Sequence, residues 1–585
     1  MKPLSKFWTA LAVLAITALY LADLQQAAAS KITGTEFVFE VSAPVAPKIS
    51  LPVHSLPPAE KSPILNREIN PLHGFGPNIG ESSDLALPDS LAPFGANGGT
   101  TPDPLLTFEG LGTDGLAPPD PVGDVGPNHY VQMVNVSFQI WDKGDPNNGI
   151  PPSIVQPDTP FNQLFTGFGG SCETRNDGNP IVLYDDQADR WLLSQFSLGE
   201  VPSLCVAVST SPDPTATYSL YEFSMPGVDA PKLAAWSDAY YVGTSSGLPN
   251  GYNAHALERG KMLAGLPAMR QSFLGLANFV MPADADGPIP PPAGEPGIFY
   301  TMYAEGFETH PPGIDRLAVY EFDVDWELPE NSTFTLATEI PIAGFNYTVC
   351  GFSFAALGCV PQPETPQILD ARSNWPMFRF QYRSFGNFAS LVGNFTVDMN
   401  GEDRAAIRWF EIRKTGEIFS LYQEGTYTPD EDHRWLGSIA MDASGNLALG
   451  YSVTSETTIP SIRYASRLAS DPPGTFSAEA ELWPGTGVQT GLERWGDYAN
   501  IVVDPVDGCH FWFTSQYHDQ DDSGFNWNTR IGIFKIPTCG GNTGTLTGQV
   551  TDGGDEVWVY PHTVSFACRR SFSSSRPARV GRRPR

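Results

Sequence analysis

The chain has 585 residues, among them 57 glycines, 54 prolines and 12% aromatic residues, and its formal net charge is −31. This acidity excludes nucleic acid as a partner, because binding phosphate needs a basic face, and it argues against anionic membrane surfaces. Only 17% of the residues are charged, and this composition is typical of many short strands joined by turns. We therefore expect an all-β protein.

The first thirty residues predict export. Lys2 and Lys6 form a positive head, residues 7–21 are almost wholly apolar, and small residues follow as far as Ser30. This order is that of a cleaved secretory signal, residues 1–30. The alternative is a membrane anchor, but the apolar run is shorter than the ~20 residues that a bilayer span needs. We expect a secreted or cell-surface monomer with no transmembrane span.

The cysteines support an oxidising compartment. Six of the seven form neighbouring couples separated by 33, 9 and 30 residues, which suits disulfides within a local β-unit. The predicted bonds are Cys172–Cys205, Cys350–Cys359 and Cys509–Cys539. Free buried thiols are the alternative, since six cysteines permit about 15 connectivities. Cys568 is left over.

Residues 31–104 are rich in proline and lack a periodic pattern, so we expect a disordered stalk or pro-segment. A repeat then occupies residues 105–540. Its unit is an apolar strand, a polar or glycine turn and a second apolar strand, and the turns lie near residues 124, 185, 238, 297, 386, 442 and 504. A period near sixty predicts one four-stranded propeller blade per repeat, hence a seven-bladed β-propeller.

Other architectures remain open, namely a pair of β-sandwiches, a β-helix, or a propeller of six or eight blades. A propeller also needs a closing strand. We expect residues 105–108 to pair with residues 531–536, the outer strand of the last blade.

The pattern changes after Pro537. Residues 544–552 read as one strand and resemble the opening of carboxypeptidase regulatory-like domains, which implies that a truncated β-sandwich module starts at 541–552. Residues 553–585 contain seven arginines and two acidic residues, and no strand pattern. We expect a disordered basic tail there, arising either from a truncated or out-of-frame end or from a native tail that binds an acidic surface.

In a propeller, the loops that lead into the innermost strands lie together at one face, the funnel face. The candidate ligand-binding residues in these loops are Arg175, Asp177, Arg372, Trp375, Arg434, Trp435, Arg494, Trp495 and Asp497. The same loops carry Asp120, Asp229, Lys232 and Tyr498. Arginine offers a planar fork for carboxylate or phosphate, and tryptophan offers a face for a sugar ring. Alternatively, Arg and Trp pack between blades, and Asp caps tight turns.

The architecture resembles that of the sialidase-like propellers, which implies a related fold. That family repeats an Asp-box in its turns, and the turns at Asp442–Gly445 and Asp504–Gly508 only echo it. No intact Asp-box and no Arg-Ile-Pro triplet is present, so the resemblance concerns fold, and it transfers no catalytic residue.

One acidic loop predicts a cation. Asp519, Asp521 and Ser523 place oxygen atoms at positions 1, 3 and 5 of a loop with Gly524 at position 6, a spacing that suits structural Ca²⁺. The twelfth position is Arg530, so the loop is not an EF-hand. A solvated acidic hairpin is the alternative, and we expect no organic cofactor.

Three functions follow from these observations. The first is a secreted, non-catalytic propeller that binds a glycan, polymer or protein through the funnel face. The second is a glycoside hydrolase or lyase that uses this face. The third is a surface-display scaffold.

Overall fold

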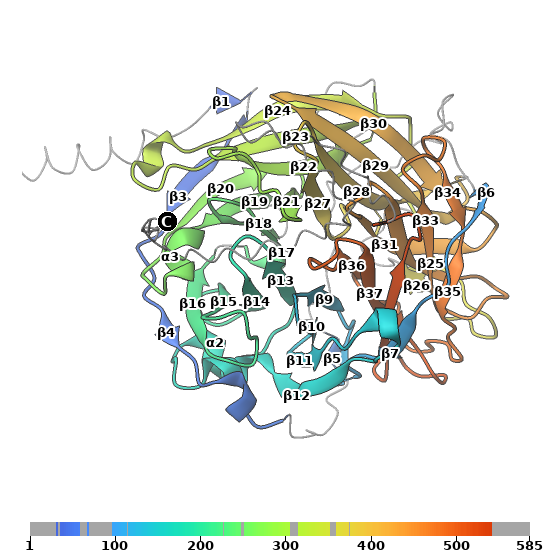
Figure 1. Ribbon diagram of the computed structural model, residues 1–585, viewed down its shortest axis with the longest axis horizontal. Coiled ribbons are helices and arrows are strands. Elements are labelled where there is room, and N and C mark those ends of the chain that lie inside the picture. The colour runs from blue at the N-terminus through green and yellow to red at the C-terminus, as the bar shows by residue number, and fades with distance from the viewer. Residues whose placement is uncertain are drawn as a thin grey trace, which may run out of the picture.

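The computed structural model describes residues 31–32, 35–58, 67–68, 96–113, 115–225, 227–246, 251–304, 314–350, 358–373, 375–399 and 401–540. The described chain is all-β, with only two one-turn α-helices, α2 (Ser171–Thr174) and α3 (Arg259–Leu263). Small antiparallel sheets stand around a common axis, which defines a β-propeller (Figure 1). No helix in this part of the chain is long and apolar enough to cross a membrane.

Within the described residues, the strand pairings form seven four-stranded units. The first three are β9 (Val122–Val125) with β10 (His129–Val134), β11 (Ser137–Asp142) and β12 (Ser153–Pro160); β13 (Ile181–Asp185) with β14 (Arg190–Ser197), β15 (Ser203–Ser209) and β16 (Tyr218–Ser224); and β17 (Asp229–Ala235) with β18 (Tyr240–Ser245), β19 (Tyr252–Leu257) and β20 (Arg270–Leu276).

The fourth and fifth units share one eight-stranded sheet, because their first strands pair in parallel. These units are β21 (Met281–Asp286), β22 (Gly297–Tyr303), β23 (Arg316–Asp323) and β24 (Thr333–Pro341), then β27 (Phe380–Ser384), β28 (Ala389–Asp398), β29 (Ala405–Thr415) and β30 (Ile418–Tyr427). The sixth and seventh are β31 (His433–Met441), β32 (Leu447–Thr454), β33 (Ser461–Arg467) and β35 (Ala480–Trp483), then β36 (Asn500–Val503), β37 (His510–Tyr517), β38 (Asn528–Lys535) and β7 (Leu106–Glu109).

The first strands of successive units contact one another around the axis, and β36 of the seventh unit contacts β9 of the first. Each predicted turn lies in, or within two residues of, the connection between the first and second strands of a unit. The chain leaves the axis through these connections on one face and returns to it on the opposite face. That second face, where the first strands begin, is the funnel face.

The ring closes as predicted. Strand β7 pairs antiparallel with β38, and Phe108 lies opposite Ile531. The Phe108 ring also contacts Trp141 of the first unit and Trp512 of the seventh, with centroid distances of 5.8 and 6.3 Å. Strand β7 therefore joins the last unit to the first through both backbone bonds and aromatic packing.

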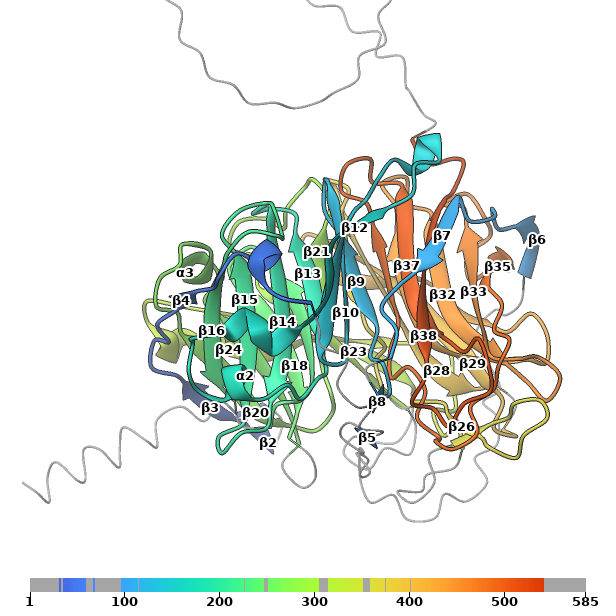
Figure 2. The same cartoon turned by 90° about the horizontal axis from the view of Figure 1, so that it is seen from below.

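The expectation of disorder for 31–104 is wrong for part of that segment. Strand β3 (Val38–Val41) pairs with β20, and β4 (Lys48–Ile49) pairs with β16, so each adds a fifth strand to a unit. Strand β6 (Ala96–Thr100) pairs with β34 (Phe476–Ala478). Figure 2 shows these strands on the outside of the ring. An outer strand presents unpaired backbone groups, and an extended segment satisfies them without needing a periodic pattern.

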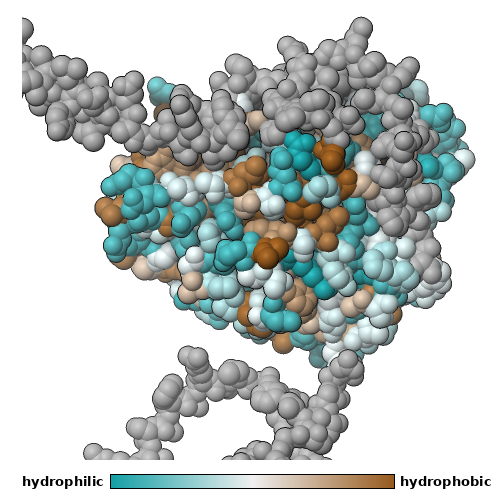
Figure 3. Space-filling view, turned by 90° about the horizontal axis from the view of Figure 1, so that it is seen from above, coloured by the Kyte–Doolittle hydropathy of each residue, from teal (hydrophilic) through white to brown (hydrophobic). Residues whose placement is uncertain are grey.

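Within the described ranges, four short 3₁₀ helices accompany the strands, namely η1 (Val53–Ser55), η2 (Pro146–Asn148), η3 (Phe161–Phe165) and η4 (Pro329–Asn331). Three short strand pairs complete the described secondary structure. They are β1 (Lys31–Ile32) with β2 (Thr35–Glu36), β5 (Arg67–Glu68) with β8 (Leu116–Ala117), and β25 (Gly358–Val360) with β26 (Leu369–Asp370). On the side of the molecule drawn in Figure 3, hydrophobic patches alternate with hydrophilic residues. Scattered apolar residues of this kind are ordinary for a globular surface.

The three predicted disulfides are confirmed. The bonds join Cys172 to Cys205, Cys350 to Cys359 and Cys509 to Cys539, with Cα–Cα distances of 5.7, 4.9 and 5.6 Å. Cys568, the signal at 1–30, the module start at 541–552 and the tail at 553–585 lie outside the described residues.

Candidate functional site

Seven charged residues gather at the funnel face and are here called the funnel cluster. They come from the chain that precedes or begins the first strand of the first, third, fifth and seventh units. The cluster consists of Asp120, Asp229, Lys232, Asp370, Arg372, Arg494 and Asp497. Ring closure brings them together from positions up to several hundred residues apart in the sequence.

Asp497 is the centre of the ion pairs. The Arg494 guanidinium donates to both of its carboxylate oxygens, with Nε 3.1 Å from Oδ1. A second guanidinium, that of Arg372, lies 3.6 Å from Oδ2. Asp497 is 8% exposed, so water screens these interactions only weakly.

Lys232 is the third cation of the cluster and is 2% exposed. Its ammonium group lies 3.7 Å from the centre of the Tyr498 ring, a favourable cation–π contact. The Tyr498 hydroxyl donates to the Pro180 carbonyl at 3.0 Å. Burial lowers the pKa of Lys232 to about 8, although Asp120 and Asp497 oppose this shift.

The two central carboxylates have pKa values shifted in opposite directions. Burial and then the Asp497 charge raise the pKa of Asp120 well above its usual range. Burial also acts to raise the pKa of Asp497, but Arg372 and Arg494 outweigh it and the net shift is downward. Asp120 Oδ1 is buried and has no hydrogen-bond partner among the described residues. The pKa values of these two carboxyls are therefore shifted apart by their surroundings.

The backbone at the cluster is unusual. Asp120, Arg372 and Asp497 have φ angles of 53°, 47° and 64°. Non-glycine residues rarely adopt this left-handed conformation, and it persists where the surrounding structure holds it, often at functional sites.

The cluster places several of the predicted ligand-binding residues together. Arg372, Arg494 and Asp497 belong to it, and Trp375 lies beside it, with the Arg372 guanidinium 5.8 Å from its ring centre. The Trp375 ring stacks on Phe279 at 4.4 Å. Asp370 was missed by the sequence prediction, although it lies only two residues before Arg372 and accepts its backbone N–H at 2.8 Å.

Three other predicted residues do not face the funnel. Arg434, Trp435 and Trp495 are all 0% exposed. The Arg434 guanidinium pairs with Asp430 and Glu479 inside the sixth unit. Trp435 and Trp495 lie 6.3 Å apart where the sixth and seventh units meet. Their complete burial fits the alternative of packing within and between blades.

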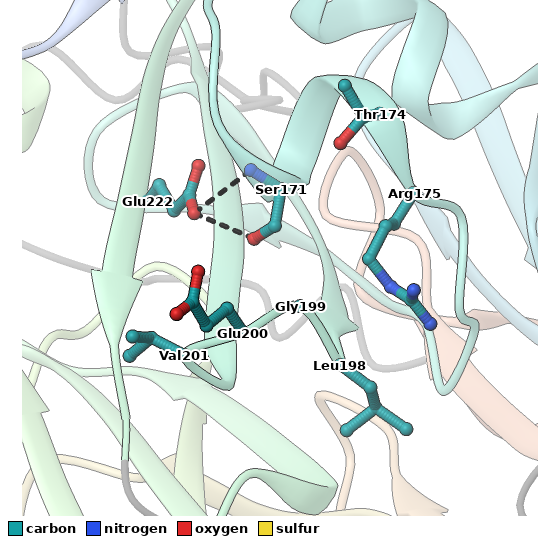
Figure 4. A pocket seen from close by; sticks show the side chains of 8 residues that line it. All are labelled: Ser171, Thr174, Arg175, Leu198, Gly199, Glu200, Val201 and Glu222. Carbon is teal, nitrogen blue, oxygen red and sulfur yellow. Dashed lines mark hydrogen bonds between the residues drawn. The ribbon is translucent and has the colours of Figure 1, made fainter.

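Arg175 and Asp177 form a separate pair. Arg175 donates through Nε and Nη2 to Asp177 at 2.6 and 2.9 Å, and Asp177 also accepts the Leu198 N–H at 2.8 Å. Arg175 lines a pocket on the second unit, between α2 and the outer strands (Figure 4). The structure does not bring this pair into the funnel cluster.

The acidic loop after β37 is held by a different residue from those predicted. Asp522 Oδ1 accepts the backbone N–H groups of Gly524, Phe525 and Asn526 at 2.8–2.9 Å. In the described ranges, no group of three or more His, Cys, Asp or Glu side chains is arranged to hold a metal ion. Calcium binding by Asp519, Asp521 and Ser523 stays a prediction.

We expect Asp522→Ala to lower the free energy of unfolding by about 1–3 kcal/mol, because three backbone donors lose their acceptor. Gln520→Ala, at an exposed position of the same loop, serves as the matched control, and urea unfolding measures both. Calcium binding additionally requires that EDTA lower the Tm of the native protein but not that of Asp519→Ala. An EDTA-insensitive Tm would contradict the calcium site.

No family model matches the sequence, and no curated protein matches it. Among solved structures, the chain is similar to a Penicillium chrysogenum α-L-arabinanase bound to arabinobiose, with 11% identity over 74% of this chain and 99% of that one, and a TM-score of 0.29. It is also similar to the α-L-arabinofuranosidase of Fusarium graminearum, with 8% identity over 77% and 98% of the two chains and a TM-score of 0.31.

A third similar structure is the Hadza microbial sialidase Hz136, with 8% identity over 72% of this chain and 65% of that one, and a TM-score of 0.32. At these values the similarities carry no conclusion about activity. The fold and the site themselves define the class of protein, which is a disulfide-bonded β-propeller with a buried cluster of paired charges at its funnel face.

Proposed function

We propose that this chain is an exported glycoside hydrolase that acts at the funnel cluster. The observation that carries the proposal is the pair Asp120 and Asp497, whose pKa values are raised and lowered respectively. Glycoside hydrolysis needs one carboxylic acid to protonate the leaving oxygen and one carboxylate to activate water or attack the sugar. Environments that shift two neighbouring carboxyls apart assign these two roles.

In this proposal Asp120 is the acid. Its proton passes to the glycosidic oxygen as the bond to the anomeric carbon breaks. Asp497 is the ionised partner, and it either takes a proton from the water that attacks the anomeric carbon or attacks that carbon itself, in which case water later hydrolyses the intermediate. Arg372 and Arg494 keep this carboxylate ionised at low pH. Because these two arginines are already paired with Asp497, their main contribution is to hold that carboxylate in place and to keep it ionised.

The charge balance favours a neutral sugar. The cluster has four carboxyl groups and three cations, so it is electrically balanced when Asp120 is protonated. An anionic sugar would need excess positive charge at the site. Arg372, a partly exposed member of the cluster, offers the planar surface of its guanidinium to a neutral ring.

Non-catalytic glycan binding is the second candidate. Asp120 and Asp497 are only 2% and 8% exposed. Such buried carboxyls could support a glycan-binding surface above them without taking part in a reaction. The three disulfides suit either candidate, since both would work in an oxidising compartment.

Turnover separates the two candidates. We expect the purified protein to release nitrophenol from at least one member of a panel of neutral nitrophenyl glycosides. We also expect Asp120→Asn to slow hydrolysis most for the substrates whose leaving group is poorest. Nitrophenyl substrates with activated leaving groups need less protonation, so their rates should fall less. Binding without turnover across the panel would leave the non-catalytic candidate.

A further inference from the structure

We propose that the pocket on the second unit is a second saccharide-binding site, distinct from the funnel cluster. The pocket has a volume of about 750 Å³, which lies in the range of small-molecule sites in proteins. It is formed by α2, the loop between β14 and β15, and the outer strand β16 (Figure 4).

The floor of the pocket is held rigidly. The disulfide between Cys172 and Cys205 ties α2 to β15, and Cys205 is the register partner of Glu222 on β16. Glu222 Oε1 accepts from Ser171 Oγ at 2.7 Å and from the Ser171 N–H at 3.3 Å. A disulfide, a sheet register and these hydrogen bonds thus fix one carboxylate in the pocket before any ligand arrives, which reduces the entropic cost of binding.

The opposite wall is fixed as well. Arg175 lies across the pocket from Glu222 in Figure 4. Its Nε and Nη2 atoms are held by Asp177, which is itself held by the Leu198 N–H. This pairing uses only one edge of the guanidinium, and none of the described contacts uses Nη1. That atom can therefore donate to a ligand. The pocket therefore has a fixed donor, Arg175, on one side and a fixed acceptor, Glu222, on the other.

The remaining lining indicates a neutral polyol. Leu198 and Val201 are 39% and 56% exposed, so the pocket offers apolar surface as well as the carboxylates of Glu200 and Glu222. A pyranose or furanose ring presents an apolar face together with hydroxyl groups that donate and accept. A compact cation would use only the carboxylates, and that of Glu222 already accepts bonds from Ser171.

Calorimetry on the full chain tests this site. The probes are neutral cello-, xylo-, malto- and arabinotetraose, titrated into Asp497→Asn so that no turnover occurs. We expect at least one probe to bind and Thr174→Trp, which places an indole in the pocket, to weaken that binding at least tenfold. Thr457→Trp, at an exposed threonine between β32 and β33, is the matched control and should leave it unchanged. Near-ultraviolet circular dichroism checks that both variants are folded.

Three outcomes would overturn the proposal. The first is that Thr174→Trp weakens the binding of none of the probes, and the second is that both tryptophan variants weaken binding equally. The third is that spermidine binds, that Thr174→Trp weakens this binding and that salt abolishes it, which would make the pocket a cation site. The result is separable from the proposed hydrolase activity, because a protein that never hydrolyses a glycoside can still bind a saccharide in a way that Thr174→Trp weakens.

Discussion

Replacing Asp497 with asparagine is expected to lower kcat/KM for a neutral glycoside by about a thousandfold or more, as loss of a group acting in the transition state commonly does. Asp497 is the one carboxyl of the pair whose pKa is lowered, so it is ionised when Asp120 is still protonated. Asparagine keeps the size of the side chain but supplies neither a negative charge nor a nucleophilic oxygen. Steady-state kinetics on the best glycoside of the panel measures the effect.

The pH profile sharpens this prediction. Activity requires ionised Asp497 and protonated Asp120, so it should fall at low pH as Asp497 gains a proton and at high pH as Asp120 loses one. Since the pKa of Asp497 is lowered and that of Asp120 is raised, the active range should be broad. Asp120→Asn should remove the high-pH limb from any residual activity.

The matched control is Asp442→Asn. Asp442 is also buried, at 0% exposure, but its carboxylate caps the turn after β31 by accepting the backbone N–H groups of Ser444 and Asn446 at 2.8 and 3.0 Å. We expect this change to cost stability without a comparable loss of kcat/KM. Similar losses in both variants would mean that Asp497 acts through the fold and not in the reaction.

Replacing Arg379 with methionine is expected to cost about 3–5 kcal/mol of unfolding free energy, the usual cost of removing one partner from a buried ionic cluster. Arg379 is 1% exposed and pairs with Asp284 and Asp286 of β21. Its charge also acts on Asp124 of the first unit. Methionine would fill much of the space but would leave these carboxylates buried without their cation. Urea unfolding at pH 8 measures the loss.

The destabilisation should shrink as the pH falls. Burial raises the pKa of Asp284 to about 6 even with Arg379 present, which is above the value of ~4 expected in the unfolded chain. A carboxyl with a raised folded pKa disfavours folding as the pH rises from the unfolded value through the folded one. Without Arg379 the pKa of Asp284 rises further, so the difference in unfolding free energy between the variant and the native protein should be largest at pH 8 and smallest near pH 4.

Arg408→Met is the control for this change. Arg408 is also 1% exposed, but its ion pair within the described part of the chain is with Glu424, whose side chain is 14% exposed. Water can partly solvate that carboxylate after the change, so we expect a smaller loss. An equal loss in the two variants, or one independent of pH, would contradict the role assigned to Arg379.

Much of the propeller could be predicted from the sequence because its determinants are local. Alternating apolar residues, turns such as Asp442–Gly445, and cysteine couples 33, 9 and 30 residues apart all report on contacts within one unit. The closing strand at Leu106–Glu109 was predictable for a related reason, since a ring built from repeats needs a strand from one end of the chain to complete the last unit.

The order of the N-terminal segment could not be predicted. Strands β3 and β4 have little apolar periodicity of their own, and they are ordered because the outer strands β20 and β16 offer unpaired backbone groups. Backbone pairing of this kind leaves little trace in the side-chain pattern, so a proline-rich segment that is bound to a sheet edge resembles one that is free.

The funnel face shows which features follow from the sequence and which follow from the tertiary structure. The sequence by itself determined which loops lie at that face and that they are rich in Asp, Arg and Trp. Only the tertiary structure decided that Arg372, Arg494 and Asp497 meet Asp120 and Lys232, whereas Arg434, Trp435 and Trp495 are buried within and between the sheets. The physical reason is that a loop's position follows from the local repeat, but the direction of each side chain depends on how neighbouring units pack around the axis.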